Sequence, residues 1–328
     1  MKTALLRWRC KNYSFWNLSC YACGSCLGWR ILFCSRRSNS FVASATCQKC
    51  NAKQFLKKSR SFKAGTSAVL SEYQILKKLD GGIRTGYSFL LPHAYNYSAE
   101  NHSFSREFLE GESVQERILR AENRQSFEDC LRISAIWLRG LHEAPIAHLC
   151  STGGGYLTTL HQLKSDCSSL ISRNSTVVSA LRFMQSILNK ISKLREKHVP
   201  LHGDFKASNL IITPEEQVYG IDFSPRFNNS NAMDIAQFVI DLLHKRRQIK
   251  VLARDIGIAD IFDMFLKAYY GRLDLDDRYP TAWWLLYFLL SHWNYELSGH
   301  KPEFLVNRYY MLILSDIMTF CSNNLDCQ

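Results

Sequence analysis

The pattern of hydrophobic and polar positions changes near residue 110. Before that point the apolar residues come in short runs broken by turn-forming residues, which is typical of β-strands. The runs that we expect to form strands are residues 27–34, 41–47, 54–58, 87–91 and 105–109. One helix is expected among them, because Tyr73, Leu76 and Leu79 recur at helical spacing.

Beyond residue 110 the spacing of apolar residues is mostly helical. Ser126 is expected to cap a helix with an inward stripe of Leu131, Ala135, Leu138 and Leu141. Further helices are expected over residues 177–196, from 234, over 258–270 and over 281–294. One stretch differs: two short apolar runs, 210–212 and 218–221, flank a turn that begins at Pro214 and predict a β-hairpin. The pattern therefore predicts an α+β chain.

The predicted hairpin carries the residues with the clearest chemistry. Asn209 precedes its first strand and Asp222 follows its second, so an amide and a carboxylate are expected at adjacent strand ends. Mg²⁺ prefers oxygen ligands of this kind, few in number, with substrate phosphates and water completing its shell. Asp204, in the loop before the hairpin, is then free to orient a hydroxyl nucleophile.

The stretch His202-Gly203-Asp204, with Asn209 five residues after the aspartate and then Ile221-Asp222-Phe223, resembles a known catalytic segment. It is similar to that of the aminoglycoside phosphotransferase and choline kinase superfamily, relatives of the protein kinases. The resemblance covers roughly residues 27–300. It implies a two-lobed protein-kinase-like fold, with a small antiparallel β N-lobe and a larger, mainly helical C-lobe.

On this resemblance the chain divides into three parts. Residues 1–26 form a basic segment rich in cysteine and aromatic residues, to which we assign no role. Residues 27–110 are expected to form the N-lobe that binds the nucleotide, and residues 111–328 the helical C-lobe with the catalytic loop and the substrate site.

The resemblance also implies roles for individual residues, with ATP and Mg²⁺ as cofactors. Asp204 would accept or orient the proton of the acceptor hydroxyl, and Lys206 would stabilise charge on the transferred phosphoryl group. Asn209 and Asp222 would hold Mg²⁺. Asp234 corresponds to a structural aspartate that braces the catalytic loop.

The nucleotide phosphates need a cation. Lys57 is expected to pair the α- and β-phosphates, and Lys58 is a near-equal alternative. Glu72, fifteen residues beyond Lys57 on the expected helix, would hold that lysine by an ion pair.

Two other stretches resemble parts that surround the nucleotide in this superfamily. Residues 106–111 are similar to the hinge, where main-chain groups, here of Glu107 and Leu109, meet adenine. The turn at Ser38-Asn39 is similar to the one over the nucleotide, but Arg36-Arg37 stands where glycine is usual. Glycine lets backbone N–H groups close on phosphates, whereas arginine supplies charge with looser geometry.

The function implied is an ATP- and Mg²⁺-dependent transfer of a phosphoryl group to a hydroxyl of a small molecule, such as a sugar, amino alcohol, glycolipid head group or aminoglycoside-like acceptor. A protein Ser/Thr kinase-like enzyme is one alternative, because Asp222-Phe223-Ser224 stands in place of Asp-Phe-Gly. However, only eleven residues separate Asp222 from Asp234, which leaves little room for a peptide platform. The other alternative is a non-catalytic nucleotide-binding pseudokinase with an N-terminal zinc-binding segment.

Charge adds little to the choice of acceptor. The 328-residue chain has a net charge of +12, and residues 1–71 contain 13 Lys or Arg and no Asp or Glu. This region is expected to be a solvated face that attracts nucleotide phosphates; peripheral contact with acidic lipid is an alternative, and nucleic acid is not expected as a partner. The apolar run 282–290 is too short to span a bilayer, and no secretory signal is recognisable, so we expect a soluble, cytoplasmic protein.

Seven of the twelve cysteines lie in the first fifty residues. Two C-x₂-C pairs among them have the spacing of a four-thiolate zinc site: Cys23, Cys26, Cys47 and Cys50. Cys10, Cys20 and Cys34 are left over. Because residues 41–58 fit a kinase-type strand, turn and strand without metal, we expect these cysteines to be strand residues and chelation to have no effect.

Overall fold

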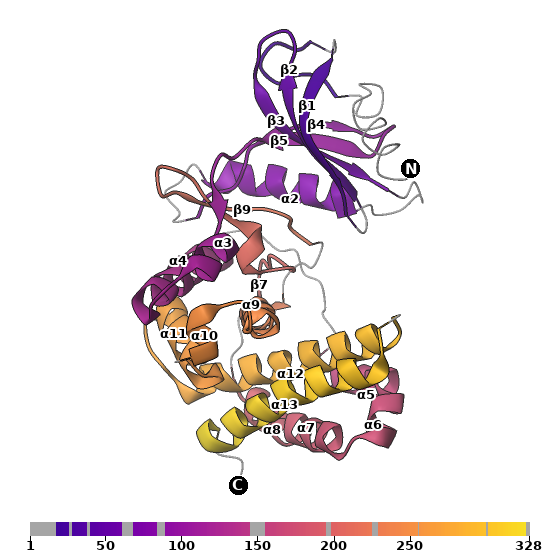
Figure 1. Cartoon of the computed structure of the whole chain (residues 1–328), viewed down its shortest axis with the longest axis vertical. Helices are drawn as coiled ribbons and strands as arrows, with labels where there is room; N and C mark the ends of the chain where they lie inside the picture. The colour runs from indigo at the N-terminus through magenta and orange to yellow at the C-terminus, as the bar shows by residue number, and fades with distance from the viewer. Residues whose placement is uncertain are drawn as a thin grey trace. The chain divides into compact units, whose positions relative to one another are not determined.

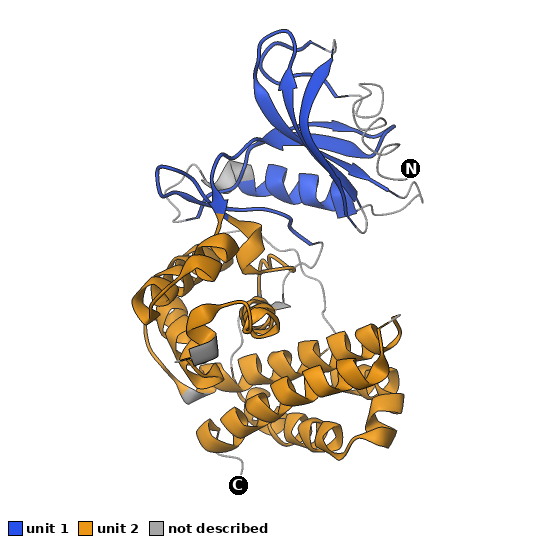
Figure 2. Ribbon diagram, in the orientation of Figure 1, with its two compact units in different colours: residues 1–112, 211–225 blue, residues 113–210, 226–328 orange. Residues whose placement is uncertain are grey.

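A computed structural model of the chain (Figure 1) describes residues 18–25, 28–37, 40–60, 68–83, 89–144, 155–194, 198–224, 229–254, 256–299 and 301–325. The chain forms two compact units (Figure 2). The first contains Met1–Glu112 and Ile211–Pro225, and the second contains Ser113–Leu210 and Arg226–Gln328. An antiparallel sheet dominates the first unit and helices dominate the second, so the predicted fold class is confirmed.

The sheet of the first unit has five strands in the order β1-β2-β3-β5-β4 (Figure 1). They are β1 (Trp29–Arg36), β2 (Ser40–Cys47), β3 (Lys53–Ser59), β4 (Ala94–Ser98) and β5 (Ser103–Glu107). The strands expected over 27–34, 41–47 and 54–58 are confirmed within one to three residues at their ends.

Helix α2 (Ala68–Ile83) packs against one face of this sheet, on β3, β4 and β5. Leu76 and Leu79 of the expected stripe are buried. Tyr73 instead stacks on Tyr97 of β4, with ring centroids 5.3 Å apart. The helix is therefore fixed to the sheet by the apolar pattern that predicted it.

The other face of β2 and β3 has its own apolar core. Lys57 reaches toward α2, so Leu56, the preceding residue, faces away from the helix because side chains alternate along a strand. The buried residues that pack on this side are Leu18, Cys20, Trp29, Ala43, Ala45, Cys47 and Leu56. The small alanine side chains of β2 leave room for the segment 18–25, which precedes the sheet in sequence.

The predicted hairpin is confirmed as β8 (Leu210–Ile212) and β9 (Val218–Gly220). Thr213 donates its N–H to the carbonyl of Gln217 at 2.9 Å and closes the turn. With β6 (Glu112–Ser113) these strands make a sheet of order β6-β8-β9. Most of the hairpin groups with the first unit, where the N–H of Gly220 donates to the carbonyl of Leu90 at 3.1 Å.

The strand expected over 87–91 is wrong. Its first two residues lie outside the described residues, and Leu90 makes an isolated bridge to Tyr219. The strand beside β5 is β4, which begins two residues after Pro92. Proline has no N–H to donate to a ladder, so the apolar run before it does not continue into the sheet.

The second unit is built mainly from helices. They are α3 (Val114–Arg120), α4 (Arg124–Glu143), α5 (Tyr156–Asp166), α6 (Ser168–Arg173), α7 (Ser175–Ser186), α8 (Leu188–Ile191), α9 (Ala232–Lys245), α10 (Lys250–Arg254), α11 (Ile258–Tyr270), α12 (Leu275–Leu297) and α13 (Glu303–Asn324). Helix α9 packs on α12, α11 on α4, and α12 on α13. Two short strands, β7 (His198–Val199) and β10 (Asn229–Ser230), pair beside the 3₁₀ turn η2 (Ala207–Asn209).

Several helix ends differ from the sequence-based expectation. The cap of α4 is Asn123, whose side chain accepts the N–H of Ser126 at 2.9 Å, so Ser126 lies inside the helix. The helix expected over 177–196 is divided at Ile187 into α7 and α8. Among the residues that the structure describes, there is no helix with the length and apolar character needed to cross a membrane.

Gly111, the last residue of the segment 106–111, has φ of +151°, and a Cβ there would lie 2.1 Å from the carbonyl oxygen of Ile212. Gly111→Ala is therefore expected to lower the free energy of unfolding by about 1–3 kcal/mol, through backbone strain and this clash. Urea unfolding measures the change. Gly155→Ala is the control, because nothing lies within 4 Å of an added Cβ there, and it should change stability by less than about 1 kcal/mol. Equal effects of the two variants would contradict the prediction.

Candidate active site

The first unit contains a lysine, with its side chain 14% exposed, held between two carboxylates. Strand β3 directs Lys57 toward α2, where its ammonium nitrogen lies 2.5 Å from Glu72 Oε2. The same nitrogen lies 2.9 Å from Asp222 Oδ1, just after β9. The side chain of Glu72 is 1% exposed and that of Asp222 is 41% exposed. The cluster is therefore shielded from solvent at Glu72 and open to solvent at Asp222.

The two carboxylates keep this lysine charged. Burial alone would lower the pKa of Lys57, but attraction to Glu72 and Asp222 raises that pKa above its usual value. Arg106 of β5 is a second buried cation on which both carboxylates act. Its guanidinium carbon lies 3.9 Å from the ring centroid of Phe55, a cation–π contact on β3. Two cations thus face two carboxylates in a largely buried site.

The backbone at Asp222 is unusual. Its φ is +61°, in the left-handed region that non-glycine residues rarely adopt. Residues held in this region cost free energy and cluster at functional sites. The next residue, Phe223, is buried and anchors the segment. The strained backbone therefore presents the Asp222 carboxylate at the end of the hairpin.

The neighbouring Lys58 lies on the opposite face of β3. Its ammonium nitrogen donates to Asn101 Oδ1 at 3.3 Å, and burial lowers its pKa. Of the two lysines between which the sequence left a choice, Lys57 is the one that pairs with Glu72.

The residues that the resemblance assigns to the hinge lie at the end of β5 and just after it. Glu107 exchanges hydrogen bonds with His93: its N–H donates to the carbonyl of His93 at 2.9 Å, and its Oε2 accepts the N–H of His93 at 3.2 Å. Leu109 is half-buried. A cavity of about 490 Å³ adjoins this segment, lined by Tyr21, Asn51, Lys53, Tyr95, Glu107, Phe108 and Glu110. Ser38-Asn39, the turn expected over the nucleotide, lies outside the described residues.

The second unit contains the other predicted residues, in the loop between β7 and η2 and at the end of η2. Lys206 Nζ lies 2.7 Å from Asp204 Oδ2. The side-chain nitrogen of Asn209 donates to the carbonyl oxygen of Asp204 at 2.9 Å and to Asp204 Oδ2 at 3.3 Å. The Asp204 side chain is 47% exposed, so it is open to a substrate while two neighbours fix its direction.

A buried aspartate braces this loop from α9. Asp234, 0% exposed, accepts the N–H groups of His202 at 2.7 Å and Gly203 at 3.0 Å. Its Oδ2 also lies 3.1 Å from Nε2 of His142, whose Nδ1 lies 2.7 Å from the hydroxyl oxygen of Tyr269. The bracing role that the resemblance implied for Asp234 is confirmed, and His142, near the end of α4, takes part in it.

Stacked aromatic side chains fix the position of the loop that contains Asp204. Phe205, next to Asp204, is fully buried and stacks on Trp137 of α4, with centroids 5.9 Å apart. On its other side it stacks on Phe238 of α9 at 5.2 Å, and Phe238 meets Phe265 of α11 at 4.9 Å. Three helices of the unit therefore fix the position of the residue beside Asp204.

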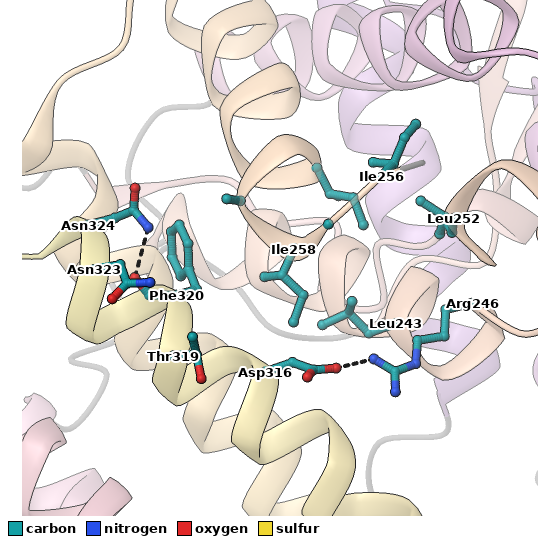
Figure 3. Close-up of a pocket in the computed structure, with 13 residues that line it drawn as sticks. Leu243, Arg246, Leu252, Ile256, Ile258, Asp316, Thr319, Phe320, Asn323 and Asn324 are labelled. Atoms are coloured by element: carbon teal, nitrogen blue, oxygen red, sulfur yellow. Dashed lines mark hydrogen bonds and ion pairs between the residues drawn. The ribbon is translucent and has the colours of Figure 1, made fainter. Parts of the chain in front are cut away.

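Elsewhere in the second unit, a cavity of about 410 Å³ lies among α9, α10, α11 and α13 (Figure 3). Its walls include Leu243, Ile256 and Phe320, with an ion pair between Arg246 and Asp316 at one side. None of the residues that line it is a site residue predicted from the sequence.

The sequence pointed to each of these clusters but missed Arg106 as a member of the first. Arg106 could be found only from its position in the sheet. It lies opposite Phe55 of β3, and Phe55 is two residues before Lys57, so both point to the same face. That relationship requires the strand register, which the sequence does not contain.

No family model and no curated protein matches the sequence. Solved structures match over nearly the whole chain. A choline/ethanolamine kinase family protein from Mesorhizobium loti has a TM-score of 0.64 and 12% identity, covering 97% of this chain and 95% of that one. An ethanolamine kinase from Plasmodium vivax has a TM-score of 0.56 and 15% identity, with coverage of 88% and 82%. An ADP-bound aminoglycoside phosphotransferase has a TM-score of 0.56 and 15% identity, with coverage of 89% and 94%.

These likenesses establish the fold. The chain has the two-lobed protein-kinase-like fold that these solved structures share, which is the fold that the resemblance implied.

Asp234→Ala is expected to destabilise the protein. It removes the acceptor for three buried donors, the N–H groups of His202 and Gly203 and the ring nitrogen of His142. Each buried donor left unsatisfied costs about 1–3 kcal/mol, so we expect a loss of about 3 kcal/mol or more in chemical unfolding. Asp241→Ala, on the same helix, removes only an ion pair with Lys245 and should cost about 1 kcal/mol or less. A loss for Asp234→Ala as small as that for Asp241→Ala would refute the bracing role.

Proposed function

We propose that this chain is an ATP- and Mg²⁺-dependent phosphotransferase that moves the γ-phosphoryl group of ATP to a hydroxyl of a small molecule. The observation that carries the proposal is the burial of Lys57 between Glu72 and Asp222. Phosphoryl transfer needs positioning and charge neutralisation more than covalent chemistry, and a fixed cation beside an accessible carboxylate supplies both.

In the proposed complex Lys57 pairs with the α- and β-phosphates, and Glu72 keeps its ammonium group in place. The hinge supplies main-chain groups of Glu107 and Leu109 to adenine. The strained backbone at Asp222 is a further support, because residues with such backbone angles cluster at functional sites and this carboxylate, 41% exposed, contacts Lys57 at 2.9 Å.

Asp222 and Asn209 are the proposed ligands of Mg²⁺. Both offer oxygen atoms, which suit this ion. The side-chain nitrogen of Asn209 donates to Asp204, so its Oδ1, which accepts a long hydrogen bond from the Ser208 hydroxyl at 3.4 Å, is the atom proposed to bind the cation. When bound, Mg²⁺ would neutralise negative charge on the β- and γ-phosphates.

Asp204 is the proposed base. The acceptor oxygen forms a bond to the γ-phosphorus while the bond from that phosphorus to the β–γ bridging oxygen breaks, so ADP leaves. The hydroxyl proton passes to the Asp204 carboxylate. Lys206, which already pairs with Asp204, is placed to stabilise the charge that develops on the transferred group.

A small acceptor is favoured over a peptide because the segment between Asp222 and Asp234 has only eleven residues. The similar structures include proteins described as choline/ethanolamine kinases and aminoglycoside phosphotransferases, which agrees with this choice. The net charge of +12 gives no support to a polycationic acceptor, so amino alcohols and sugars are the first compounds to test.

Release of ADP in the presence of amino alcohols, sugars and aminoglycosides tests the function directly. With an acceptor that stimulates ADP release, Asp204→Asn should lower turnover by about 10²- to 10⁴-fold and leave ATP affinity unchanged, because only the proton acceptor is lost. Asp166→Asn, an exposed position on α5, is the matched control and should keep wild-type turnover. Near wild-type turnover in Asp204→Asn would remove this residue from the chemistry.

Two adjacent lysines allow a second test. Lys57→Met should weaken ATP binding by about 10- to 100-fold, the worth of one charge-assisted hydrogen bond, whereas Lys58→Met should leave it unchanged. Both variants lose a buried lysine from β3, and binding of a fluorescent ATP analogue compares them after circular dichroism has shown that each is folded. A folded Lys57→Met protein with undiminished affinity would contradict the proposed role.

A further inference from the structure

Four cysteines of the first unit converge on one point. The Sγ atoms of Cys20, Cys23, Cys47 and Cys50 all lie within 4.8 Å of one another. The distance is 3.5 Å between those of Cys20 and Cys50 and 3.8 Å between those of Cys23 and Cys47. Four thiolates at about 2.3 Å from a tetrahedral zinc ion are separated by about 3.8 Å. The observed spacing therefore suits a single central ion.

The four thiols are not two disulfides. All four are free cysteines, and sulfur atoms in a disulfide are about 2.05 Å apart. Each sulfur has three others close by, whereas a disulfide would pair it with one. The segment that contains the four cysteines offers no carboxylate of its own as a competing ligand, because residues 1–71 contain no Asp or Glu and 13 Lys or Arg. A basic segment is a favourable setting for the net negative charge of a zinc ion bound by four thiolates.

The two C-x₂-C loops have the same main-chain hydrogen bonds. In the first, Cys20 N–H donates to the carbonyl of Ser25 at 3.0 Å, and Gly24 N–H donates to the carbonyl of Cys20 at 2.9 Å. The equivalent bonds in the second loop run from Cys47 to Ala52 at 2.9 Å and from Asn51 to Cys47 at 2.9 Å.

The loops also share a left-handed residue after their second cysteine, with φ of +65° at Gly24 and +61° at Asn51. In each loop two main-chain N–H groups point at the sulfur of the first cysteine. They come from Ala22 and Cys23 in the first loop and from Lys49 and Cys50 in the second. Such donors stabilise a thiolate. Two unrelated stretches of chain thus form the same turn and direct their sulfur atoms to the same place.

We propose that Cys20, Cys23, Cys47 and Cys50 bind one structural zinc ion. The ion would tie the segment 18–25 to the turn after β2, over the face of the sheet that points away from Lys57. The other contacts of that segment include the burial of Leu18, a hydrogen bond from the Trp29 indole N–H to the carbonyl of Leu18 at 3.1 Å, a stack of Tyr21 on Tyr95 at 4.0 Å and a hydrogen bond from Asn96 to the carbonyl of Ser19 at 3.1 Å.

This set differs from the one that spacing suggested. Cys26 lies outside the described residues, and Cys20 takes its place in the cluster. The sequence CYACGSC contains both choices, Cys20-x₂-Cys23 and Cys23-x₂-Cys26. The residue after the second cysteine separates them: it must accept a positive φ, which suits Gly24 better than Leu27. The expectation that these cysteines are strand residues without metal is replaced by this proposal.

Elemental analysis of the full-length protein, purified without chelator, should find one zinc ion per chain. Replacement by Co²⁺ should give the charge-transfer and d–d absorption of a tetrahedral thiolate site. Cys50→Ser is the most informative variant because Cys50 is exposed, so the substitution removes a ligand without opening the core. It should lose the zinc and have a lower Tm than the wild type, and a chelator should lower the wild-type Tm but not that of Cys50→Ser.

Cys20→Ser and Cys26→Ser form the matched pair that separates the two possible sets of ligands. Zinc should be lost from Cys20→Ser and retained by Cys26→Ser. The reverse result overturns the assignment in favour of the other set. A wild-type protein that contains no zinc and takes up no Co²⁺, or a Cys50→Ser protein with undiminished zinc, overturns the site itself.

Discussion

The ion pairs of the Lys57 ammonium group with Glu72 and Asp222 are the interactions on which the first unit depends most. Glu72 is fully buried, and a buried carboxylate without a cation costs several kcal/mol. Lys57 supplies that cation and at the same time reaches Asp222, so β3, α2 and the end of the hairpin are fixed by one group. The second unit solves the same problem differently, because the buried carboxylate of Asp234 is satisfied by main-chain N–H groups of the catalytic loop. In each unit a buried carboxylate thus helps to fix the position of a more exposed one: Glu72 acts on Asp222 through Lys57, and Asp234 acts on Asp204 through the loop backbone.

Much of this arrangement could be predicted from the sequence. The spacing of apolar residues predicted a part rich in strands followed by a part rich in helices. The turn residues that begin at Pro214 predicted the position of the hairpin. The spacing from Asp204 to Asn209 and Asp222 carried the resemblance that implied the fold, and solved structures with that fold match over nearly the whole chain. The same resemblance pointed to Glu72 as the partner of Lys57, because Glu72 lies on the helix that follows β3 in sequence.

What could not be predicted depends on contacts between distant parts of the chain. Arg106 joins the Lys57 cluster through strand register, and His142 joins Asp234 through the packing of α4 against α9 and α11. The choice between Cys20 and Cys26 depends on a backbone angle at Gly24 rather than on spacing. The strand at residues 87–91 failed because an apolar run is compatible with burial as well as with pairing.

The claim at the centre of this account is that the Lys57 cluster holds a magnesium nucleotide. Calorimetric titration of ATP into the wild-type protein and into Asp222→Ala, each with and without Mg²⁺, tests it most directly. The account predicts that Mg²⁺ strengthens ATP binding to the wild-type protein and that this effect is lost in Asp222→Ala. No ATP binding to the wild-type protein under either condition, or an equal Mg²⁺ effect in both proteins, would contradict it.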